Sequence, residues 1–366
     1  MICFFYNWYT PAYKAGGPIQ SLQNLGTFLE SHYQLNFICS NKDLNGEILN
    51  VKPNSWLNHT KKIKVLYSDT SNLVKWWFFI KKLNDSISYI NGIYSLKFNL
   101  IPIIVSKKLI ISPRGMLQES NINIKKNKKL IYLNILRYSG ILNKSKWHAT
   151  DEQEAKDIQK WFPKNNGIII AHNIPKQPLK EIGYPNKKQN YLRLIFLSLI
   201  AEKKNLHLVL AGLSNTENIS LDIYGPIKDN DYWKNQCLPL INKLSDKVNY
   251  LGDILPNEVQ DTISKYDALI LLSKGENFGH AIYESLSVGR PVIISEFTPW
   301  KNLKEKKAGL NVDIKNEKDI TDSLSYFKNI NEEEFNNYCK GAHHLAVNYY
   351  FKTDFKGAYN KLFSFN

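Results

Sequence analysis

The sequence predicts an α/β protein built from two doubly wound, Rossmann-like domains, and three observations support this. Short apolar runs that suit buried parallel strands alternate with helical segments in both halves of the chain. A polar, proline-bearing stretch at 172–190 interrupts the alternation once, as expected of an interdomain linker. The length of 366 residues also exceeds what a typical single core can organise.

The first half contains apolar runs that we expect to be strands, at 2–7, 35–40, 63–67, 87–90, 109–112, 147–150 and 168–171. The intervening segments 19–30, 73–83 and 152–161 have the spacing of helices with one apolar face. We therefore place the first Rossmann-like domain at 1–175.

The alternation restarts after the linker, with strands expected at 192–197, 220–224, 248–251, 268–272, 291–295 and 310–312. The tail at 317–363 has helical patterns alone. We place the second Rossmann-like domain at 176–350, and expect a C-terminal helix at 351–366 to pack back toward the first domain. Two such domains in tandem predict a central cleft lined by the carboxyl ends of strands.

The charge of the chain is strongly basic and unevenly distributed. Lys and Arg outnumber Asp and Glu by 48 to 33, a net charge of +15. Residues 1–175 hold 23 basic against 10 acidic side chains, a net of +13, whereas 176–366 hold 25 against 23, a net of +2. This asymmetry predicts an anionic partner for the first domain, such as lipid headgroups, phosphates or nucleic acid.

The lack of a recognisable targeting segment and the scattered cysteines favour a reducing, cytoplasmic location. No apolar run reaches the roughly 18–20 residues needed to cross a bilayer. The first apolar run lacks a preceding basic region, so we expect a core strand rather than a signal peptide. The four cysteines are scattered without metal or redox spacing.

The most informative stretch runs from Gly275 to Pro291, with the sequence GENFGHAIYESLSVGRP. A purely apolar run precedes it and a helix is predicted at 281–288, ended by Gly289. Two carboxylates, Glu276 and Glu284, therefore stand eight positions apart, one after a strand and one in the helix that follows. That edge of an open α/β sheet is where ligands bind.

This stretch closely resembles the signature of retaining glycosyltransferases of family 4, which have the GT-B fold. The resemblance implies that Glu276 contacts the donor sugar and that Glu284 binds the ribose hydroxyls of the nucleotide. It also implies that the backbone of Asn277, Phe278 and Gly279 lies against the sugar and the diphosphate. A carboxylate suits two hydroxyl donors, and N–H groups at a helix N-terminus suit a diphosphate.

Further matches to this family extend over nearly the whole chain. Gly16 and Gly17 resemble its N-terminal Gly-Gly loop, where glycine lets the backbone approach the donor phosphates. Arg114 stands where many members carry a histidine near the reacting carbon, so with Glu276 it is the expected catalytic pair. An arginine can neutralise phosphate or orient the acceptor, but it cannot act as a base. Asn173 resembles a family turn only in part, and we assign it no role.

One departure from the family concerns the diphosphate. The family carries an arginine and a lysine five residues apart after the first strand of the second domain, and Lys204 matches the lysine. Leu199 stands at the arginine's position, which removes a bidentate phosphate contact. Either Lys203 or another basic residue compensates, or donor binding is weaker, or the chain is catalytically degenerate.

A metal-nucleotide motif is an alternative interpretation of Asp229-Asn230-Asp231, but we favour a loop and helix N-cap there. No His, Cys and carboxylate cluster has metal spacing. We therefore expect no cofactor and no metal requirement, with a nucleotide diphosphate sugar as co-substrate.

Two basic, apolar stretches of the first half suit the surface of an anionic membrane. One is KWWFFIKK at 75–82, and the other runs from Lys125 through 126–133 as KKNKKLIYL. A core helix with solvated lysines is the alternative for each stretch.

The sequence thus predicts a retaining hexosyltransferase that moves a hexose from a nucleotide sugar to a glycan or lipid-linked acceptor. The resemblance suggests a role in cell-surface polysaccharide or lipopolysaccharide synthesis, on the inner face of the cytoplasmic membrane. The acceptor-binding domain would be the first and the donor-binding domain the second. A degenerate module that binds glycan or membrane is the main alternative, and no nucleic-acid-binding motif is present. The donor's sugar and base, the acceptor and the linkage stay open.

Overall fold

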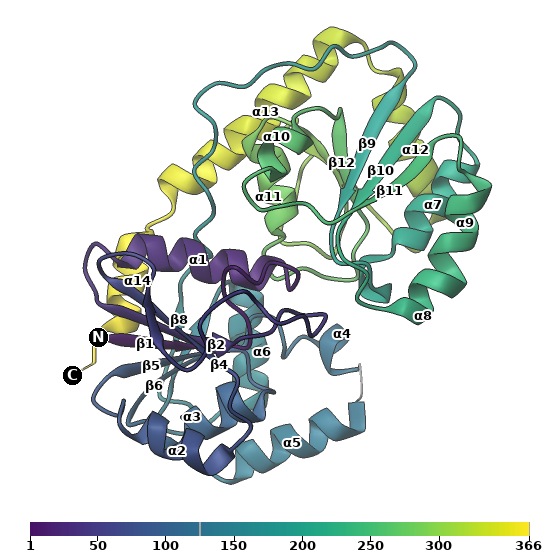
Figure 1. Ribbon diagram of the computed structural model, residues 1–366. Coiled ribbons are helices and arrows are strands. Elements are labelled where there is room, and N and C mark those ends of the chain that lie inside the picture. The colour runs from purple at the N-terminus through teal and green to yellow at the C-terminus, as the bar shows by residue number, and fades with distance from the viewer. Residues whose placement is uncertain (124–125, 366) are drawn as a thin grey trace. The chain divides into compact units, whose positions relative to one another are not determined.

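The computed structural model describes residues 1–123 and 126–365 of the chain. The backbone divides into two compact units, which we treat separately. Unit 1 comprises Met1–Ile174 together with Asp354–Asn366, of which Asn366 lies outside the described residues, and unit 2 comprises Pro175–Thr353. Figure 1 labels the helices and strands of both units.

Unit 1 is built on one sheet with the strand order β3-β4-β2-β1-β5-β6-β7-β8. All neighbouring strands are parallel except β3, which pairs antiparallel with β4. The strands are β1 (Ile2–Phe5), β2 (Leu35–Ser40), β3 (Trp56–Asn58), β4 (Ile63–Ser68), β5 (Ile87–Asn91), β6 (Lys108–Ser112), β7 (Lys146–Ala149) and β8 (Ile168–Ile170). The short β3 was not predicted from the sequence, since two half-exposed residues and one exposed residue give no clear alternation.

Helices cover both faces of this sheet, with α1 and α14 on one side and α2, α3 and α5 on the other (Figure 1). They are α1 (Gly17–Leu29), α2 (Leu73–Lys81), the π-helical turn η1 (Leu96–Leu100), α3 (Ile101–Val105), α4 (Glu119–Ile122), α5 (Lys126–Tyr138), α6 (Glu152–Trp161) and α14 (Phe355–Phe363). Apolar residues of β1, β5 and β6 are buried against them. The predicted helix at 152–161 is confirmed, and Asp151 caps it by accepting from the Glu154 amide at 2.7 Å.

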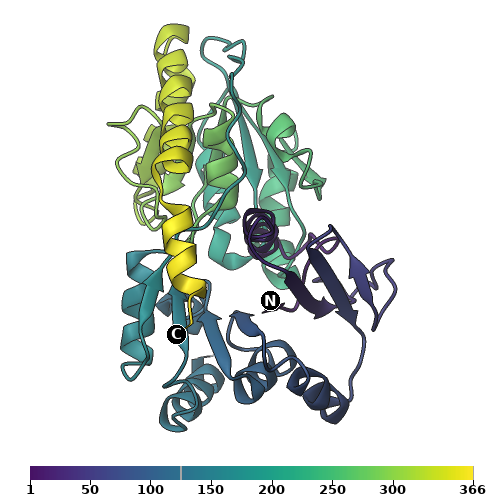
Figure 2. The same cartoon turned by 90° about the vertical axis from the view of Figure 1, so that its left-hand side faces the viewer.

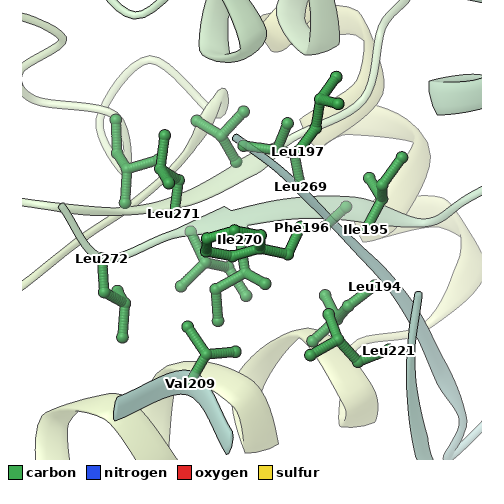
Figure 3. Packing of buried hydrophobic residues seen from close by; sticks show 14 of the residues in the cluster. Leu194, Ile195, Phe196, Leu197, Val209, Leu221, Leu269, Ile270, Leu271 and Leu272 are labelled. Carbon is green, nitrogen blue, oxygen red and sulfur yellow. The ribbon is translucent and has the colours of Figure 1, made fainter. Parts of the chain in front are cut away.

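Unit 2 is also a parallel sheet covered by helices, with the strand order β11-β10-β9-β12-β13-β14. The strands are β9 (Leu192–Leu197), β10 (Ile219–Tyr224), β11 (Val248–Gly252), β12 (Ala268–Leu271), β13 (Val292–Ser295) and β14 (Gly309–Val312). Apart from Arg193 in β9, the two central strands are apolar on both faces. Figure 3 shows their side chains packed together, Leu194 and Phe196 from β9 with Ile270 from β12.

The helical elements of unit 2 are η2 (Glu202–Lys204), α7 (Leu206–Ser214), α8 (Asn230–Tyr232), η3 (Trp233–Cys237), α9 (Leu238–Lys243), α10 (Val259–Ile263), α11 (His280–Ser287), α12 (Glu317–Asn329) and α13 (Glu332–Lys352). α13 is one long helix, drawn in yellow in Figure 2, and it packs against α11. The predicted two Rossmann-like domains and the helical tail are thereby confirmed. The linker at 172–190 has no regular element, and Lys187 ties it to unit 2 by donating to the Tyr191 carbonyl at 2.5 Å.

Candidate functional site

The strand order of unit 2 creates a position where two neighbouring strands send their connections in opposite directions. From β9 the chain moves outward through β10 to β11, and it then returns to β12 and moves the other way to β14. The loops that follow β9 and β12 therefore diverge at the carboxyl edge of the sheet. Such a switch point leaves room for a ligand in open α/β sheets.

Lys204 and Glu276 meet at this switch point. Lys204 ends η2 after β9, Glu276 follows β12, and the Lys204 Nζ donates to Glu276 Oε1 at 2.6 Å across 72 residues of sequence. Their side chains are 19% and 12% exposed, so both remain partly accessible. The pair places a cation and a two-oxygen acceptor side by side, and an incoming anion could compete with the carboxylate for the ammonium group.

Two hydrogen bonds to backbone carbonyl groups hold the two loops together around this ion pair. The Asn205 side chain donates to the Leu272 carbonyl at 2.8 Å, and the Lys274 amide donates to the Lys203 carbonyl at 2.8 Å. Asn205 adopts a left-handed backbone conformation with φ 52°, which asparagine tolerates better than most residues. The position of Lys204 is therefore fixed by its neighbours and not by the ion pair alone.

Helix α11 begins at the next part of the predicted signature. Gly279 caps its N-terminus with φ +79°, where a Cβ would lie 2.8 Å from Ile282 Cδ1. At the other end the Arg290 amide donates to the Ser285 carbonyl at 2.8 Å, and the Gly289 amide donates to the Leu286 carbonyl at 3.0 Å. These two bonds form a Schellman motif, so the helix-ending role predicted for Gly289 is confirmed.

Glu284 lies in α11 and is almost completely buried, with 7% of its surface exposed. Burial raises the pKa of its carboxyl group from 4.5 to about 7, and the positive charge of Lys176 opposes that rise. The Lys176 ammonium itself donates to the Pro256 carbonyl at 2.7 Å. Glu284 is thus a desolvated acceptor that would gain from ligand hydroxyl groups directed at it.

Phe278 belongs to an aromatic cluster that fixes the loop before α11. Its ring lies 5.6 Å from Trp300, 5.8 Å from Tyr283 and 5.5 Å from Tyr349, measured between ring centroids. The Trp300 indole N–H donates to the Phe278 carbonyl at 2.7 Å. Since that bond orients the Phe278–Gly279 peptide, the indole positions the stretch in which Asn277, Phe278 and Gly279 are the predicted donor contacts.

Leu199 is half-buried and lies next to Ile200, in the loop that leads from β9 to Lys204. The loop after β10 runs beside it, because the Ile200 amide donates to the Pro226 carbonyl at 2.9 Å. The departure from the family pattern therefore removes a guanidinium from the same loop that carries Lys204.

Unit 1 has its own switch point, between β1 and β5. The loop after β1 carries Gly16, which has φ 71° and precedes the first turn of α1, and Gly17, the first residue of that helix. The Asp43 carboxylate accepts from the Tyr13 amide at 3.2 Å and holds this loop. Both glycines therefore lie at the carboxyl edge of the first sheet.

Arg114 follows β6 at the same edge and is held by three neutral side chains. Its Nε donates to Asn91 Oδ1 at 3.0 Å, one Nη donates to the Tyr89 hydroxyl at 2.8 Å, and the other Nη donates to Asn173 Oδ1. Asn173, 59 residues away, is thus a buried partner that the sequence analysis left without a role. The sequence offered one indication of this contact. Asn173 follows a predicted strand, and the parallel strands β5, β6 and β8 all end at the same edge of the sheet.

His148 extends this network and is fixed in one tautomer. Its Nε2 lies 2.8 Å from the Ala171 carbonyl, which can only accept, so Nε2 carries the proton. Its Nδ1, 2.6 Å from the Tyr89 hydroxyl, therefore accepts from that group. Burial, reinforced by the charge of Arg114, lowers the pKa of His148 to about 3. The imidazole is neutral at pH 7, and Arg114 supplies the positive charge of the cluster.

The predicted N-cap at Asp229 is confirmed, because its carboxylate accepts from the Tyr232 amide at 3.0 Å. Within 1–123 and 126–365, no group of three or more His, Cys, Asp or Glu residues could hold a metal ion. Within the same ranges, no helix combines the length and apolar character of a transmembrane span. Lys125, part of one predicted membrane stretch, lies outside the described residues.

Comparison with known proteins finds sequence similarity over about half of the chain. Residues 180–342 match the family described as glycosyl transferases group 1. The chain is also 27% identical over 181 residues to the O-antigen biosynthesis glycosyltransferase WclY of Escherichia coli. That alignment covers 46% of this chain and 48% of WclY, so the chain matches about half the length of this relative.

Solved structures match the fold of the whole chain. A sucrose-phosphate synthase from Thermosynechococcus elongatus superposes with a TM-score of 0.73 at 14% identity, covering 99% of this chain and 98% of that one. HepE of Anabaena, solved with UDP and glucose, gives 0.70 at 13% identity with the same coverage. WaaG, described as a glycosyltransferase of lipopolysaccharide biosynthesis, gives 0.68 at 12% identity, again over 99% and 98%. These likenesses establish the two-domain GT-B fold class.

Proposed function

We propose, on the match of residues 180–342 to the glycosyl transferases group 1 family, that the chain transfers a hexose from a nucleotide diphosphate sugar. The observation that carries the proposal is the Lys204–Glu276 pair at the switch point of unit 2, within that segment. The buried Glu284 on the helix that follows Glu276 supports the same proposal, because it is an acceptor whose burial favours hydroxyl partners.

The donor is assigned to unit 2. Glu284 accepts hydrogen bonds from the ribose hydroxyls, and Lys204 neutralises the diphosphate. Glu276 and Asn277, together with the Phe278–Gly279 backbone, contact the sugar. Each assignment fits the chemistry of its group: carboxylates accept from vicinal hydroxyls, and an ammonium group next to a carboxylate binds phosphate as a point charge.

The reaction we propose retains the configuration of the anomeric carbon. The bond between that carbon and the diphosphate oxygen breaks, and a hydroxyl oxygen of the acceptor bonds to the same face. The acceptor's proton passes to a phosphate oxygen of the departing nucleotide, so no protein base is required. The protein stabilises the diphosphate and the oxocarbenium-like sugar, a task for preorganised charges and dipoles. Lys204 and helix N-termini would supply the positive field without a metal ion.

The acceptor site is assigned to unit 1. The acceptor itself is assigned to the class of lipid-linked or lipopolysaccharide-type glycans. The name of WclY and the excess of basic residues in 1–175 support this class of substrate. Arg114, held by Tyr89, Asn91 and Asn173, has the rigid guanidinium needed to orient an anionic acceptor. Gly16 and Gly17 stay predicted contacts of the donor phosphates, on the family resemblance alone.

We further propose that unit 1 binds an anionic membrane surface, as a peripheral protein on the cytoplasmic face. Helix α2 buries Trp76 but leaves Phe78 58% exposed between Lys75 and Lys81. Helix α5 leaves Ile131 and Ile135 both 63% exposed, on a helix that begins with lysines. Exposed apolar side chains flanked by lysines suit the headgroup region of a bilayer.

A donor screen tests the function directly. UDP-, GDP- and ADP-sugars are added to the full chain, with the melting temperature and hydrolysis of the donor as readouts. A donor that raises the melting temperature in the wild type but not in Glu284→Ala supports the assignment. If no donor does so, the chain is a GT-B module without donor binding, and salt-sensitive vesicle binding that survives Glu276→Ala would then favour a membrane-binding protein.

A further inference from the structure

The ammonium group of Lys204 at the switch point of unit 2 is already paired with a carboxylate. Lys204 and Glu276 form an ion pair at 2.6 Å, and Leu199 contributes no charge. A nucleoside diphosphate carries two to three negative charges at the phosphates, so a further cation near Lys204 would be expected to stabilise it. That cation should come from a loop that shares the same edge of the sheet.

The loop after β10 is joined to the loop of Leu199 by backbone contacts. The Ile200 amide donates to the Pro226 carbonyl at 2.9 Å, and the Lys228 amide returns a bond to the Ile200 carbonyl at 3.0 Å. Gly225 makes this approach feasible, since a Cβ there would lie 1.9 Å from the Ser198 carbonyl oxygen. Lys228 is therefore anchored beside the residue that directly follows Leu199.

Lys228 and Lys204 are held by neighbouring loops, so their positive charges repel each other. Its side chain is exposed, yet its pKa is lowered, first by partial desolvation and then by repulsion from Lys204. Acidic side chains close by in sequence are already engaged: Asp229 caps α8, and Glu202 pairs with Lys274 at 2.7 Å. Two mutually repelling lysines create a positive field that a shared anion would relieve.

We propose that Lys228 is the second cationic contact of the donor diphosphate, replacing the guanidinium that Leu199 does not provide. The inference rests on the proposed donor binding and adds one residue to it. Lys228 from the loop after β10 and Lys204 from the loop after β9 jointly bind the two phosphate groups of the donor. Binding should therefore discriminate between a nucleoside diphosphate and the corresponding monophosphate through Lys228.

The test compares Lys228→Ala with the wild type by titration calorimetry. UDP, GDP and ADP are titrated into the wild type, and the tightest of them is carried forward with its monophosphate. We expect Lys228→Ala to weaken binding of the diphosphate about ten-fold, which corresponds to the loss of one charge-assisted hydrogen bond. Binding of the monophosphate should weaken less than about two-fold. Lys243→Ala, at an exposed lysine of α9, is the matched control and should leave both affinities unchanged.

A rescue arm tests proximity. Leu199→Arg in the Lys228→Ala background should restore most of the diphosphate affinity, because the guanidinium starts from the adjoining loop. An unchanged affinity in Lys228→Ala, while Lys204→Ala loses binding, would overturn the inference and leave the proposed function intact. A loss in Lys203→Ala in place of Lys228→Ala would overturn it equally. If the wild type binds none of the three diphosphates, the proposed function fails as well.

Discussion

Replacing Glu284 by glutamine should make the stability of unit 2 less dependent on pH. In the folded protein, burial holds the pKa of this carboxyl group at about 7, against an ordinary value of 4.5. A folded-state pKa above the unfolded one means that the folded state binds the proton more tightly. Glu284 therefore favours folding below pH 4.5, and that contribution is lost as the pH rises through about 7.

The size of the effect follows from the two pKa values. Linkage between protonation and folding gives a loss of about 2.5 kcal/mol from the Glu284 carboxyl between pH 5 and pH 8, at 1.36 kcal/mol per pKa unit. The glutamine does not titrate, so Glu284→Gln lacks this loss. Any fixed cost of burying the amide is the same at both pH values and cancels from the comparison.

The assay is the unfolding transition of unit 2, followed by calorimetry and by denaturant titration of the full chain at pH 5 and pH 8. We expect Glu284→Gln to gain about 2.5 kcal/mol relative to the wild type on going from pH 5 to pH 8. Glu305→Gln, at an exposed glutamate of the same unit, controls for the lost negative charge. A difference between Glu284→Gln and the wild type that is the same at both pH values would refute the argument that burial raises this pKa.

Three further predictions concern binding and folding. In the proposed donor site the ribose binds the ionised form of Glu284, so donor affinity should rise about ten-fold from pH 6 to pH 8 in calorimetric titration of the preferred nucleotide. Gly225→Ala should destabilise unit 2 by at least about 3 kcal/mol or prevent its folding, measured by denaturant unfolding, because the Cβ meets the Ser198 carbonyl oxygen at φ +131°. Ile131→Ser with Ile135→Ser should lower binding to anionic vesicles several-fold in a flotation assay, because both side chains are exposed on α5.

Each of these predictions has a matched control. A pH dependence of donor affinity that persists in Glu284→Gln would assign the titration to another group. Gly46→Ala is the control for Gly225→Ala, because nothing lies within 4 Å of the Cβ position there although its φ of +85° is also positive. Ile48→Ser, at a 69% exposed isoleucine of unit 1, should leave vesicle binding unchanged, and an equal loss there would remove the role of α5.

The local pattern of residues was sufficient for the fold class and for the main motif. Alternating apolar runs predicted the strands and helices of both Rossmann-like units, because each element depends on neighbours within a few positions. Gly289 marked the end of α11 for the same local reason, since it adopts a positive φ that other residues rarely take. The placement of Glu276 after a strand and Glu284 on a helix followed directly.

Contacts between distant loops could be identified only from the strand order. Lys204 meets Glu276 because β9 and β12 are neighbours, although 72 residues separate the two side chains. Asn173 meets Arg114 over 59 residues because β8 and β6, separated only by β7, end at the same edge of the sheet in unit 1. The raised pKa of Glu284 depends on its burial, which sequence spacing does not reveal. The approach of Lys228 to the Leu199 loop likewise depends on two strands lying side by side, since hydrophobic periodicity specifies an element but not its neighbours in the sheet.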